Sequence, residues 1–278
     1  MKQPAKFCFT ARKGGVGKTQ LTINTAAFFA NDGKKVLIVG CDQQDDLADQ
    51  LLGGTEEYDP ENHASLAGVL KNEYSAEKAV YTTCAYASYK YSASPSKVRR
   101  SYLRNDKYTM DVMPAGNDIF YISNEDPFFL KKHLDPLAAK YDVIFFDVPP
   151  SDLDIVMMVY FYADYAIVPV TDQASFKSVN MVTDSLALVN SEGHDIVLLG
   201  VLFNRDIKAR SLKRFNKQIF EETIGESVFH ETIRDSADIE NAGAFATPLA
   251  SYRMSAVTEN LYRFYIELCN RADHLEDK

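Results

Sequence analysis

The sequence predicts an α/β protein with a doubly wound, mostly parallel sheet and helices on both faces, and three observations support this fold class. Short apolar runs alternate along most of the chain with segments of helical pattern, the order that builds parallel sheets. These runs are almost continuously apolar, which is typical of strands buried on both faces. The first run also leads into a glycine-rich turn and then a helical segment.

Each expected element follows from its local pattern. The expected strands are Phe7–Thr10, Val36–Val39, Met110–Met113, Val143–Phe146, Tyr165–Val170 and Ile196–Phe203. The spacing predicts a first helix over 18–31, which Gly33 ends, and a final helix over 255–272, whose apolar residues form one narrow stripe. We expect that stripe to pack on the sheet.

Length and composition favour one soluble domain spanning residues 1–278. The hydrophobic content of 46% and the charged content of 25% are those of ordinary globular proteins. No apolar run approaches the ~20 residues of a membrane span, and the N-terminus leaves no room for a signal peptide, so we expect a cytoplasmic protein without membrane attachment. The cysteines have neither zinc-site nor disulfide-framework spacing; they are Cys8, Cys41, Cys84 and Cys269.

One segment, about 86–108, interrupts the regular alternation. It is rich in Tyr and Ser and carries a series of cations: Lys90, Lys97, Arg99, Arg100, Arg104 and Lys107. We interpret it as an insertion before the Met110–Met113 strand. A solvated loop is the expected form, and a partner-binding loop is the alternative.

The first glycine-rich turn has the chemistry of a phosphate-binding loop. It reads Lys13-Gly14-Gly15-Val16-Gly17-Lys18-Thr19 and is followed by Gln20. Its backbone N–H groups and the start of the next helix favour an anion. Lys18 can reach β- and γ-phosphates, and the Thr19 hydroxyl can hold Mg²⁺. The strict pattern requires Gly where this chain has Arg12, so the motif is a deviant form with an additional lysine, Lys13.

Two aspartates are candidates for the remaining chemistry. Asp147 ends an apolar run in the arrangement called Walker B, where a strand-terminal carboxylate holds Mg²⁺. Asp42 follows the second strand, at the edge where open α/β sheets bind nucleotides. We expect the neighbouring Asp45 and Asp46 to be surface charges.

These motifs, in this order, resemble the ParA/MinD/iron-protein family of P-loop ATPases. The resemblance implies an ATP-sandwich homodimer that binds ATP and Mg²⁺, in which Lys13 reaches the partner subunit's nucleotide and Asp42 orients the attacking water. The turn Val148-Pro149-Pro150-Ser151 resembles the ParA-type second switch. Residues implied to lie on the adenine side are Asn204, Arg205 and Pro248.

DNA contact requires a local basic patch, because the chain has a formal net charge of −9. The residues with helical spacing on one face are Arg210, Lys213, Arg214 and Lys217. Such a stripe can follow phosphates without reading bases, and the alternative is a merely solvated helix face. One departure from ParA relatives is the run from Ile233 to Asp238, where acids stand in place of arginines.

The leading hypothesis is a ParA-type partition ATPase for plasmid or chromosome segregation. It implies an ATP-dependent dimer that binds non-specific DNA on the nucleoid, turns over ATP slowly alone, and is released when a ParB-like centromere-binding protein stimulates hydrolysis. One alternative is a MinD-like or cargo-positioning ATPase, although the acidic C-terminus does not suit anionic lipid. Another is an iron-protein reductase, but no cysteine follows Asp147 to hold a cluster.

Overall fold

The computed structural model describes residues 3–53, 55, 57–94, 97–172, 175–206, 225–244, 247–252 and 255–276. In these ranges the chain forms one sheet of eight strands in the order β3-β4-β2-β5-β1-β6-β7-β8. Neighbouring strands are parallel except β3 and β4. The strands are β1 (Ala5–Phe9), β2 (Val36–Gly40), β3 (Tyr81–Ser94), β4 (Lys97–Met113), β5 (Val143–Asp147), β6 (Tyr165–Val170), β7 (Val197–Asp206) and β8 (Val228–Arg234).

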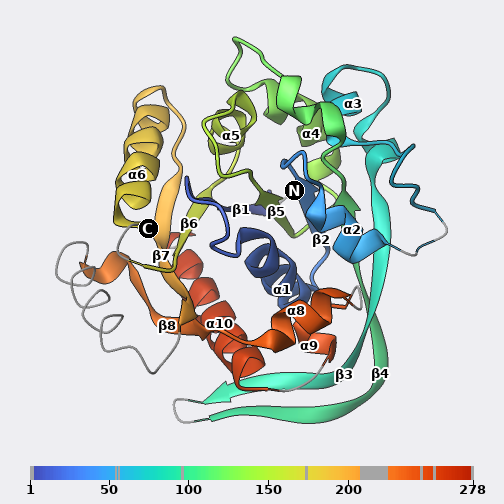
Figure 1. Cartoon of the computed structure of the whole chain (residues 1–278), viewed down its shortest axis with the longest axis vertical. Coiled ribbons are helices and arrows are strands. Elements are labelled where there is room, and N and C mark those ends of the chain that lie inside the picture. Colours follow the sequence, from blue (N-terminus) through green and yellow to red (C-terminus); the bar gives the residue numbers. More distant parts are fainter. Residues whose placement is uncertain are drawn as a thin grey trace.

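Helices cover both faces of this sheet (Figure 1). Those belonging to one face are α1 (Lys18–Asn31), α2 (Asp46–Leu52), α8 (Ala237–Ala244), α9 (Leu249–Tyr252) and α10 (Ala256–Glu276). Those belonging to the other are α3 (Leu66–Leu70), α4 (Phe129–Ala138), α5 (Asp154–Tyr160) and α6 (Ser175–Ser191). Short 3₁₀ turns, η1 (Ala76–Ala79), η2 (Asn117–Tyr121) and η3 (Gly225–Ser227), complete the connections.

The alternation of side chains along the central strands creates a core on each side of the sheet. In β1, Phe7 and Phe9 belong to the core beneath α1 and α10, whereas Cys8 between them belongs to the other core. Phe7 stacks on Phe145 of β5 with ring centroids 5.4 Å apart, and Phe9 lies 6.2 Å from Phe264 of α10. Burying each such ring contributes about 1.5–3 kcal/mol. The doubly wound α/β fold predicted from the sequence is therefore confirmed.

The expected apolar strands are all present, and α1 has the predicted bounds. Two strands were missed, β3 and β8. The prediction of a solvated loop at 86–108 is wrong, because that segment lies in β3 and β4, which pair antiparallel from Tyr81↔Val112 to Ser94↔Lys97. Residues Met110–Met113 are only the end of β4. The two strands form a long hairpin that curves past α9 (Figure 1).

Candidate nucleotide site

The candidate phosphate loop connects β1 to α1 and lies at the carboxyl edge of the sheet. Gly15 and Gly17 have φ values of +72° and +85°, in the left-handed region that glycine adopts without strain. A Cβ atom on Gly17 would also lie 2.4 Å from Asn204 Nδ2. Helix α1 has no side-chain N-cap and no acid in its first turn. Its first N–H groups therefore remain available to an anion.

Asn204, near the end of β7, supports this loop. Its Nδ2 donates a hydrogen bond of 2.8 Å to the carbonyl of Val16, and the side chain is buried. Its Oδ1 is buried without a hydrogen-bond partner among the described residues, so one acceptor remains for a ligand. The adjacent Arg205 has a left-handed φ of +54°. The implied adenine role of both residues remains a prediction.

Two other residues predicted to bind the nucleotide, Gln20 and Pro248, lie on or next to α1. Gln20 Nε2 donates to Gln50 of α2, so in this structure its amide is engaged by protein. Pro248 is buried next to α9, and the N–H of Leu249 donates to Asn24 of α1 at 2.7 Å. The Pro248 turn is therefore attached to the helix that begins at the phosphate loop.

Lys18, Thr19, Asp42 and Asp147 come together at the ends of neighbouring strands. β1 and β2 flank β5, so that Phe9 and Gly40 are both register partners of Asp147. Thr19 hydrogen-bonds the Asp147 carboxylate. Burial lowers the pKa of Lys18, and the charges of Asp147 and Asp42 oppose that shift. The four residues thus form one electrostatic unit.

Asp147 has the features of a cation ligand. Burial raises its pKa to about 7, although the Thr19 hydrogen bond and the Lys18 charge act in the opposite direction. Its Oδ1 is buried with no hydrogen-bond partner among the described residues. Thr19, Asp42 and Asp147 line the same small pocket. A hydroxyl and a carboxylate oxygen in such a place suit Mg²⁺.

Asp45 is not the surface charge that the sequence predicts. It is buried in a left-handed conformation, with a φ of +52°. Its two carboxylate oxygens accept the N–H groups of Ala115 and Gly116, each at 3.1 Å. Burial raises its pKa, while those hydrogen bonds and His63 act to lower it. Asp45 therefore ties the Asp42 loop to the end of β4, whereas Asp46 is exposed as expected.

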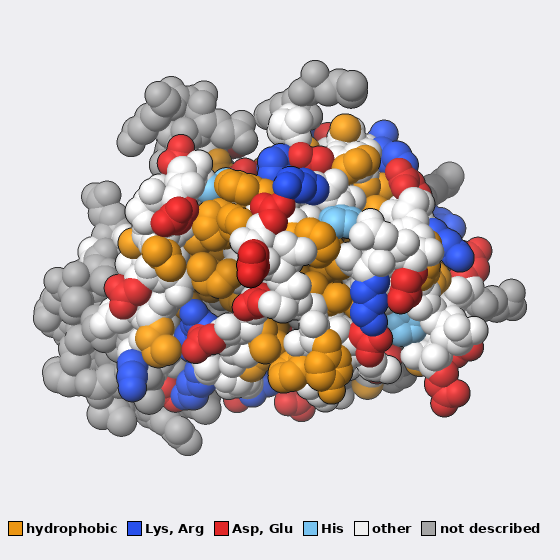
Figure 2. All heavy atoms as spheres, turned by 90° about the horizontal axis from the view of Figure 1, so that it is seen from above, with side chains coloured by type: hydrophobic (Ala, Val, Ile, Leu, Met, Phe, Trp, Pro, Cys, Tyr) orange, Lys and Arg blue, Asp and Glu red, His pale blue; other side chains and the backbone are white. Residues whose placement is uncertain are grey.

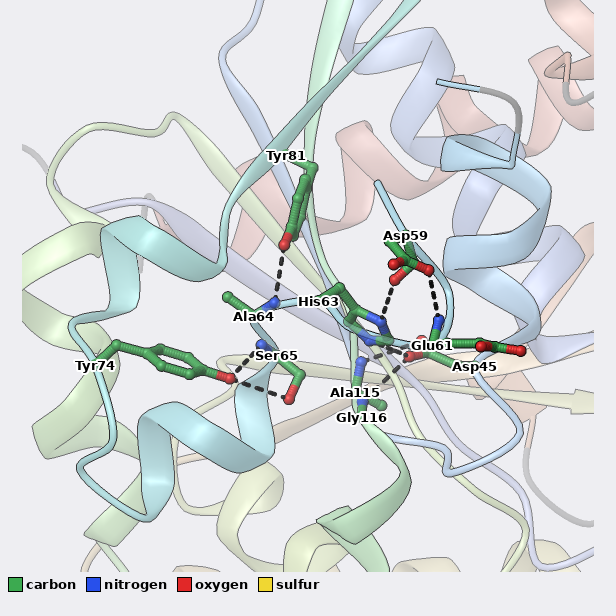
Figure 3. Close-up of polar contacts among 10 residues, drawn as sticks. All are labelled: Asp45, Asp59, Glu61, His63, Ala64, Ser65, Tyr74, Tyr81, Ala115 and Gly116. Carbon is green, nitrogen blue, oxygen red and sulfur yellow. Dashed lines mark hydrogen bonds and ion pairs between the residues drawn. The ribbon is translucent and has the colours of Figure 1, made fainter. Parts of the chain in front are cut away.

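The segment before α3 closes over Asp45 (Figure 3). His63 Nε2 lies 3.6 Å from Asp45 Oδ2, and its Nδ1 lies 3.0 Å from the carbonyl of Asp59. Two tyrosine hydroxyls accept the next backbone N–H groups, Tyr81 from Ala64 and Tyr74 from Ser65. The loop that carries Asp42 and Asp45 is thus held in place by a cluster of hydrogen bonds and one His63–Asp45 contact.

Lys13 pairs within its own chain with Asp172, just after β6. Ser175 also donates to Asp172 Oδ1, from its N–H at 3.0 Å and its hydroxyl at 2.9 Å. Burial acts to raise the pKa of Asp172, but the hydrogen bonds from Lys13 and Ser175 outweigh it and the pKa is lowered. The Lys13 side chain is 39% exposed and accessible to a second molecule.

Arg12 connects the phosphate loop to the turn predicted as the second switch. Its Nη1 donates to the carbonyl of Ser151 at 2.6 Å and its Nη2 to Ser185 Oγ of α6 at 3.0 Å. Its backbone N–H donates to Ser178 Oγ at 2.8 Å. The sequence marked Arg12 only as a departure from the strict motif. Asp172 and Asp45 belong to no sequence motif that would have indicated these contacts.

The remaining predictions concern the basic cluster, the cysteines and the membrane. The predicted DNA-binding residues Arg210, Lys213, Arg214 and Lys217 lie outside the described residues. Cys8 and Cys41 are both buried in the core that lies beneath α3 to α6. Cys84 is exposed on β3, and Cys269 lies on α10. None of the helices in the described ranges is long and apolar enough to cross a membrane.

Comparisons with known proteins find relatives along most of the chain. The family model AAA_31, described as an AAA domain, matches residues 5–196. The chromosome partitioning protein ParA of Myxococcus xanthus is 25% identical over 251 residues, covering 88% of this chain and 81% of that protein. The light-independent protochlorophyllide reductase iron-sulfur ATP-binding protein of Heliobacterium modesticaldum is 29% identical over 232 residues, covering 81% and 72%.

The fold also matches solved structures. An ATP complex of McdA from Cyanothece superposes with a TM-score of 0.77 at 17% identity, covering 97% of this chain and 98% of that one. At this identity the likeness shows the fold alone.

Proposed function

The chain belongs to the AAA_31 family, and from that premise we propose that it is a ParA-type ATPase that hydrolyses ATP to ADP and phosphate in DNA segregation. The resemblance to ParA proteins that the sequence predicts is confirmed by the relatives. The observation that carries the proposal is the convergence of Lys18, Thr19 and Asp147 at one sheet edge beside a second lysine, Lys13.

Each residue at this edge has a role in the proposed reaction. The phosphate-loop N–H groups bind the phosphates, and Lys18 neutralises their charge where it develops during hydrolysis. Thr19 and Asp147 would hold Mg²⁺, which when bound supplies additional positive charge to the phosphate oxygens. Asp42 orients the attacking water.

The proposed active form is a homodimer on ATP. Lys13 is held by Asp172 in the single chain and is accessible, so it can exchange this partner for the phosphates bound to a second subunit. We expect Lys13→Ala to bind ATP and to fail as a hydrolytic dimer. Size exclusion with ATP and a phosphate-release assay measure both properties, and full partner-stimulated turnover in this variant would show that the lysine is incidental.

Asp42 provides an independent test of the same reaction. We expect Asp42→Ala to bind ATP and accumulate as a dimer, because water is no longer oriented for attack. Normal turnover with no accumulated dimer would exclude Asp42 from catalysis. Asp195→Ala is the control and should leave turnover unchanged, since Asp195 is an exposed carboxylate just before β7 and does not line the pocket of Asp42.

DNA binding and partner release complete the proposed cycle. The ATP dimer would bind non-specific DNA on the nucleoid in the cytoplasm, through Arg210, Lys213, Arg214 and Lys217, until a ParB-like centromere-binding protein stimulates hydrolysis. We expect Lys213→Glu with Arg214→Glu to abolish ATP-dependent retention on random-sequence DNA while nucleotide binding persists. Unchanged, salt-sensitive retention would remove this cluster from the proposal.

A MinD-like or cargo-positioning ATPase is the second candidate. Liposome co-sedimentation with ATP discriminates the two: binding to anionic lipid as strong as binding to DNA would favour the second. For an iron-protein reductase the buried Cys8 and Cys41 are unsuitable cluster ligands between subunits. A four-iron absorption band after anaerobic reconstitution would overturn the partition proposal.

A further inference from the structure

The outer part of the β3–β4 hairpin, residues 89–94 and 97–102, forms a regular two-stranded ribbon. Its register runs without interruption from Tyr89↔Tyr102 to Ser94↔Lys97, after an irregularity between Ala87 and Tyr89. Near its base the hairpin is fixed to the body of the protein: Thr83 Oγ1 donates to Leu51 of α2 at 2.8 Å, and the Tyr108 hydroxyl lies 2.7 Å from Ser251 Oγ of α9. The ribbon therefore extends from an anchored base.

The hairpin's charge is opposite to that of the whole protein. Residues 86–108 contain six Lys or Arg residues and one acid, Asp106, whereas the chain has a formal net charge of −9. On the face shown in Figure 2, by contrast, basic and acidic side chains of the described residues are interspersed. The hairpin is thus a local concentration of positive charge in an acidic protein.

The register divides the ribbon's residues between two different faces, because opposed residues share a face and successive residues alternate. One face contains only cationic and hydroxyl-bearing residues: Lys90, Ser92 and Ser94 on β3, with Ser101, Arg99 and Lys97 opposite them on β4. The other face contains Tyr89, Tyr91 and Ala93, with Tyr102, Arg100 and Val98 opposite them. Three of the ribbon's four cations, Lys90, Lys97 and Arg99, therefore share one face, and the other residues of that face are all serines.

Lys, Arg and Ser are residue types that contact DNA phosphates. The cationic face extends over about 14 Å from Lys90 to Ser94, at a strand rise of about 3.4 Å per residue. A two-stranded antiparallel ribbon has dimensions that the major groove of B-DNA admits. Anionic lipid is less suitable, because this face has no apolar residue beside its cations to enter the membrane.

We propose that the cationic face of the ribbon, defined by Lys90, Lys97 and Arg99, is a second DNA-binding surface that contacts the phosphate backbone of duplex DNA in the ATP-bound state. The inference rests on the proposed function, since it concerns the same DNA. It assigns to the hairpin a contact independent of the 210–217 cluster.

The test compares two adjacent arginines on opposite faces. Arg99→Gln removes one charge from the cationic face, and Arg100→Gln removes the same charge from the other. Binding of each full-length variant to a random-sequence duplex, with ATP, is measured as a function of salt. We expect Arg99→Gln to reduce the slope of log K against log salt by about 0.9, and Lys97→Gln with Arg99→Gln by about 1.8, whereas Arg100→Gln leaves it unchanged.

Other outcomes overturn the inference. Equal effects of Arg99→Gln and Arg100→Gln would show non-specific charge rather than a binding face, and an unchanged slope in both would exclude the ribbon while the proposed function stands. Failure of the unmodified protein to bind DNA with ATP would defeat the ribbon and the DNA-segregation proposal together. If Arg99→Gln lost binding to phosphatidylserine vesicles while its DNA binding stayed intact, the face would be assigned to membranes. DNA-independent ATP hydrolysis and thermal unfolding verify that each variant is folded.

Discussion

Replacement of Asp45 by alanine should destabilise the protein although no sequence motif includes this residue. The carboxylate accepts the N–H groups of Ala115 and Gly116, each at 3.1 Å, and both of those residues are buried. Asp45→Ala removes the acceptor of both N–H groups, and because the two groups are buried, water does not replace the lost carboxylate. His63, whose Nε2 lies 3.6 Å from Asp45 Oδ2, also loses its neighbour.

The magnitude follows from these contacts. An unpaired buried N–H costs about 1–3 kcal/mol, so two cost about 2–6 kcal/mol. Alanine in the left-handed region, where Asp45 has a φ of +52°, adds about 1 kcal/mol. Removal of a carboxylate whose pKa is raised by burial offsets part of the sum. We expect a net loss of about 3 kcal/mol in the free energy of unfolding.

Urea unfolding at neutral pH measures this loss, with Asp45→Asn as the matched control. Asparagine tolerates the left-handed conformation and retains one carbonyl oxygen as an acceptor, so its loss should be about half that of alanine. A loss below about 1 kcal/mol for Asp45→Ala, or equal losses for both variants, would refute the assignment of these hydrogen bonds as the source of stability.

Two other predictions concern glycine and pH. Gly17→Ala should abolish ATP binding, because its Cβ would lie 2.4 Å from Asn204 Nδ2. Gly33→Ala is the control: its φ of +84° is similar, but its Cβ would meet nothing within 4 Å, so it should only lower stability by about 1 kcal/mol. Calorimetric titration with ATP distinguishes the two variants, and equal ATP binding by both would contradict the role of the contact with Asn204. For Glu267, burial acts to raise the pKa, but N–H groups of β8 outweigh it and the pKa is lowered. Its contribution to stability is therefore present above the unfolded pKa of about 4.5 and is lost as pH falls through the folded value. Glu267→Gln should flatten the acid side of the stability profile in urea titrations, and an unchanged profile would count against it.

The sequence identifies elements whose signal is local. The buried strands on either side of β1 are continuous apolar runs, and α1 is bounded by Lys18 at the phosphate loop and by Gly33. Strands β3 and β8 are partly polar, and their pairing depends on residues elsewhere in the chain, so periodicity did not reveal them. The composition of β3 and β4 is polar and rich in Tyr and Ser, which is typical of a loop. The strands become recognisable only when the two segments are paired, because each supplies the hydrogen-bond partners of the other.

The same distinction applies to the site. The glycine loop and Asp147 are recognised from residues close in sequence, and the structure brings them together with Asp42. Asp45 acquires its role from N–H groups 70 and 71 residues away, and Asp172 from a lysine 159 residues earlier. Nothing in the residues around Asp45 or Asp172 indicates that a hydrogen-bond partner will come from a distant part of the chain.

Arg12 shows how a failed match to a motif can have a structural reason. The strict pattern has glycine at this position, yet here the side chain is 13% exposed and bonds the Ser151 carbonyl after β5 and the Ser185 hydroxyl of α6. Its backbone N–H is bound by Ser178 of the same helix. Because one residue of the phosphate loop contacts both the Pro149-Pro150 turn and α6, a displacement of that turn must either move the loop or break these hydrogen bonds. The arginine thus couples the phosphate loop to the segment that the sequence predicts as the second switch, a connection that glycine could not make.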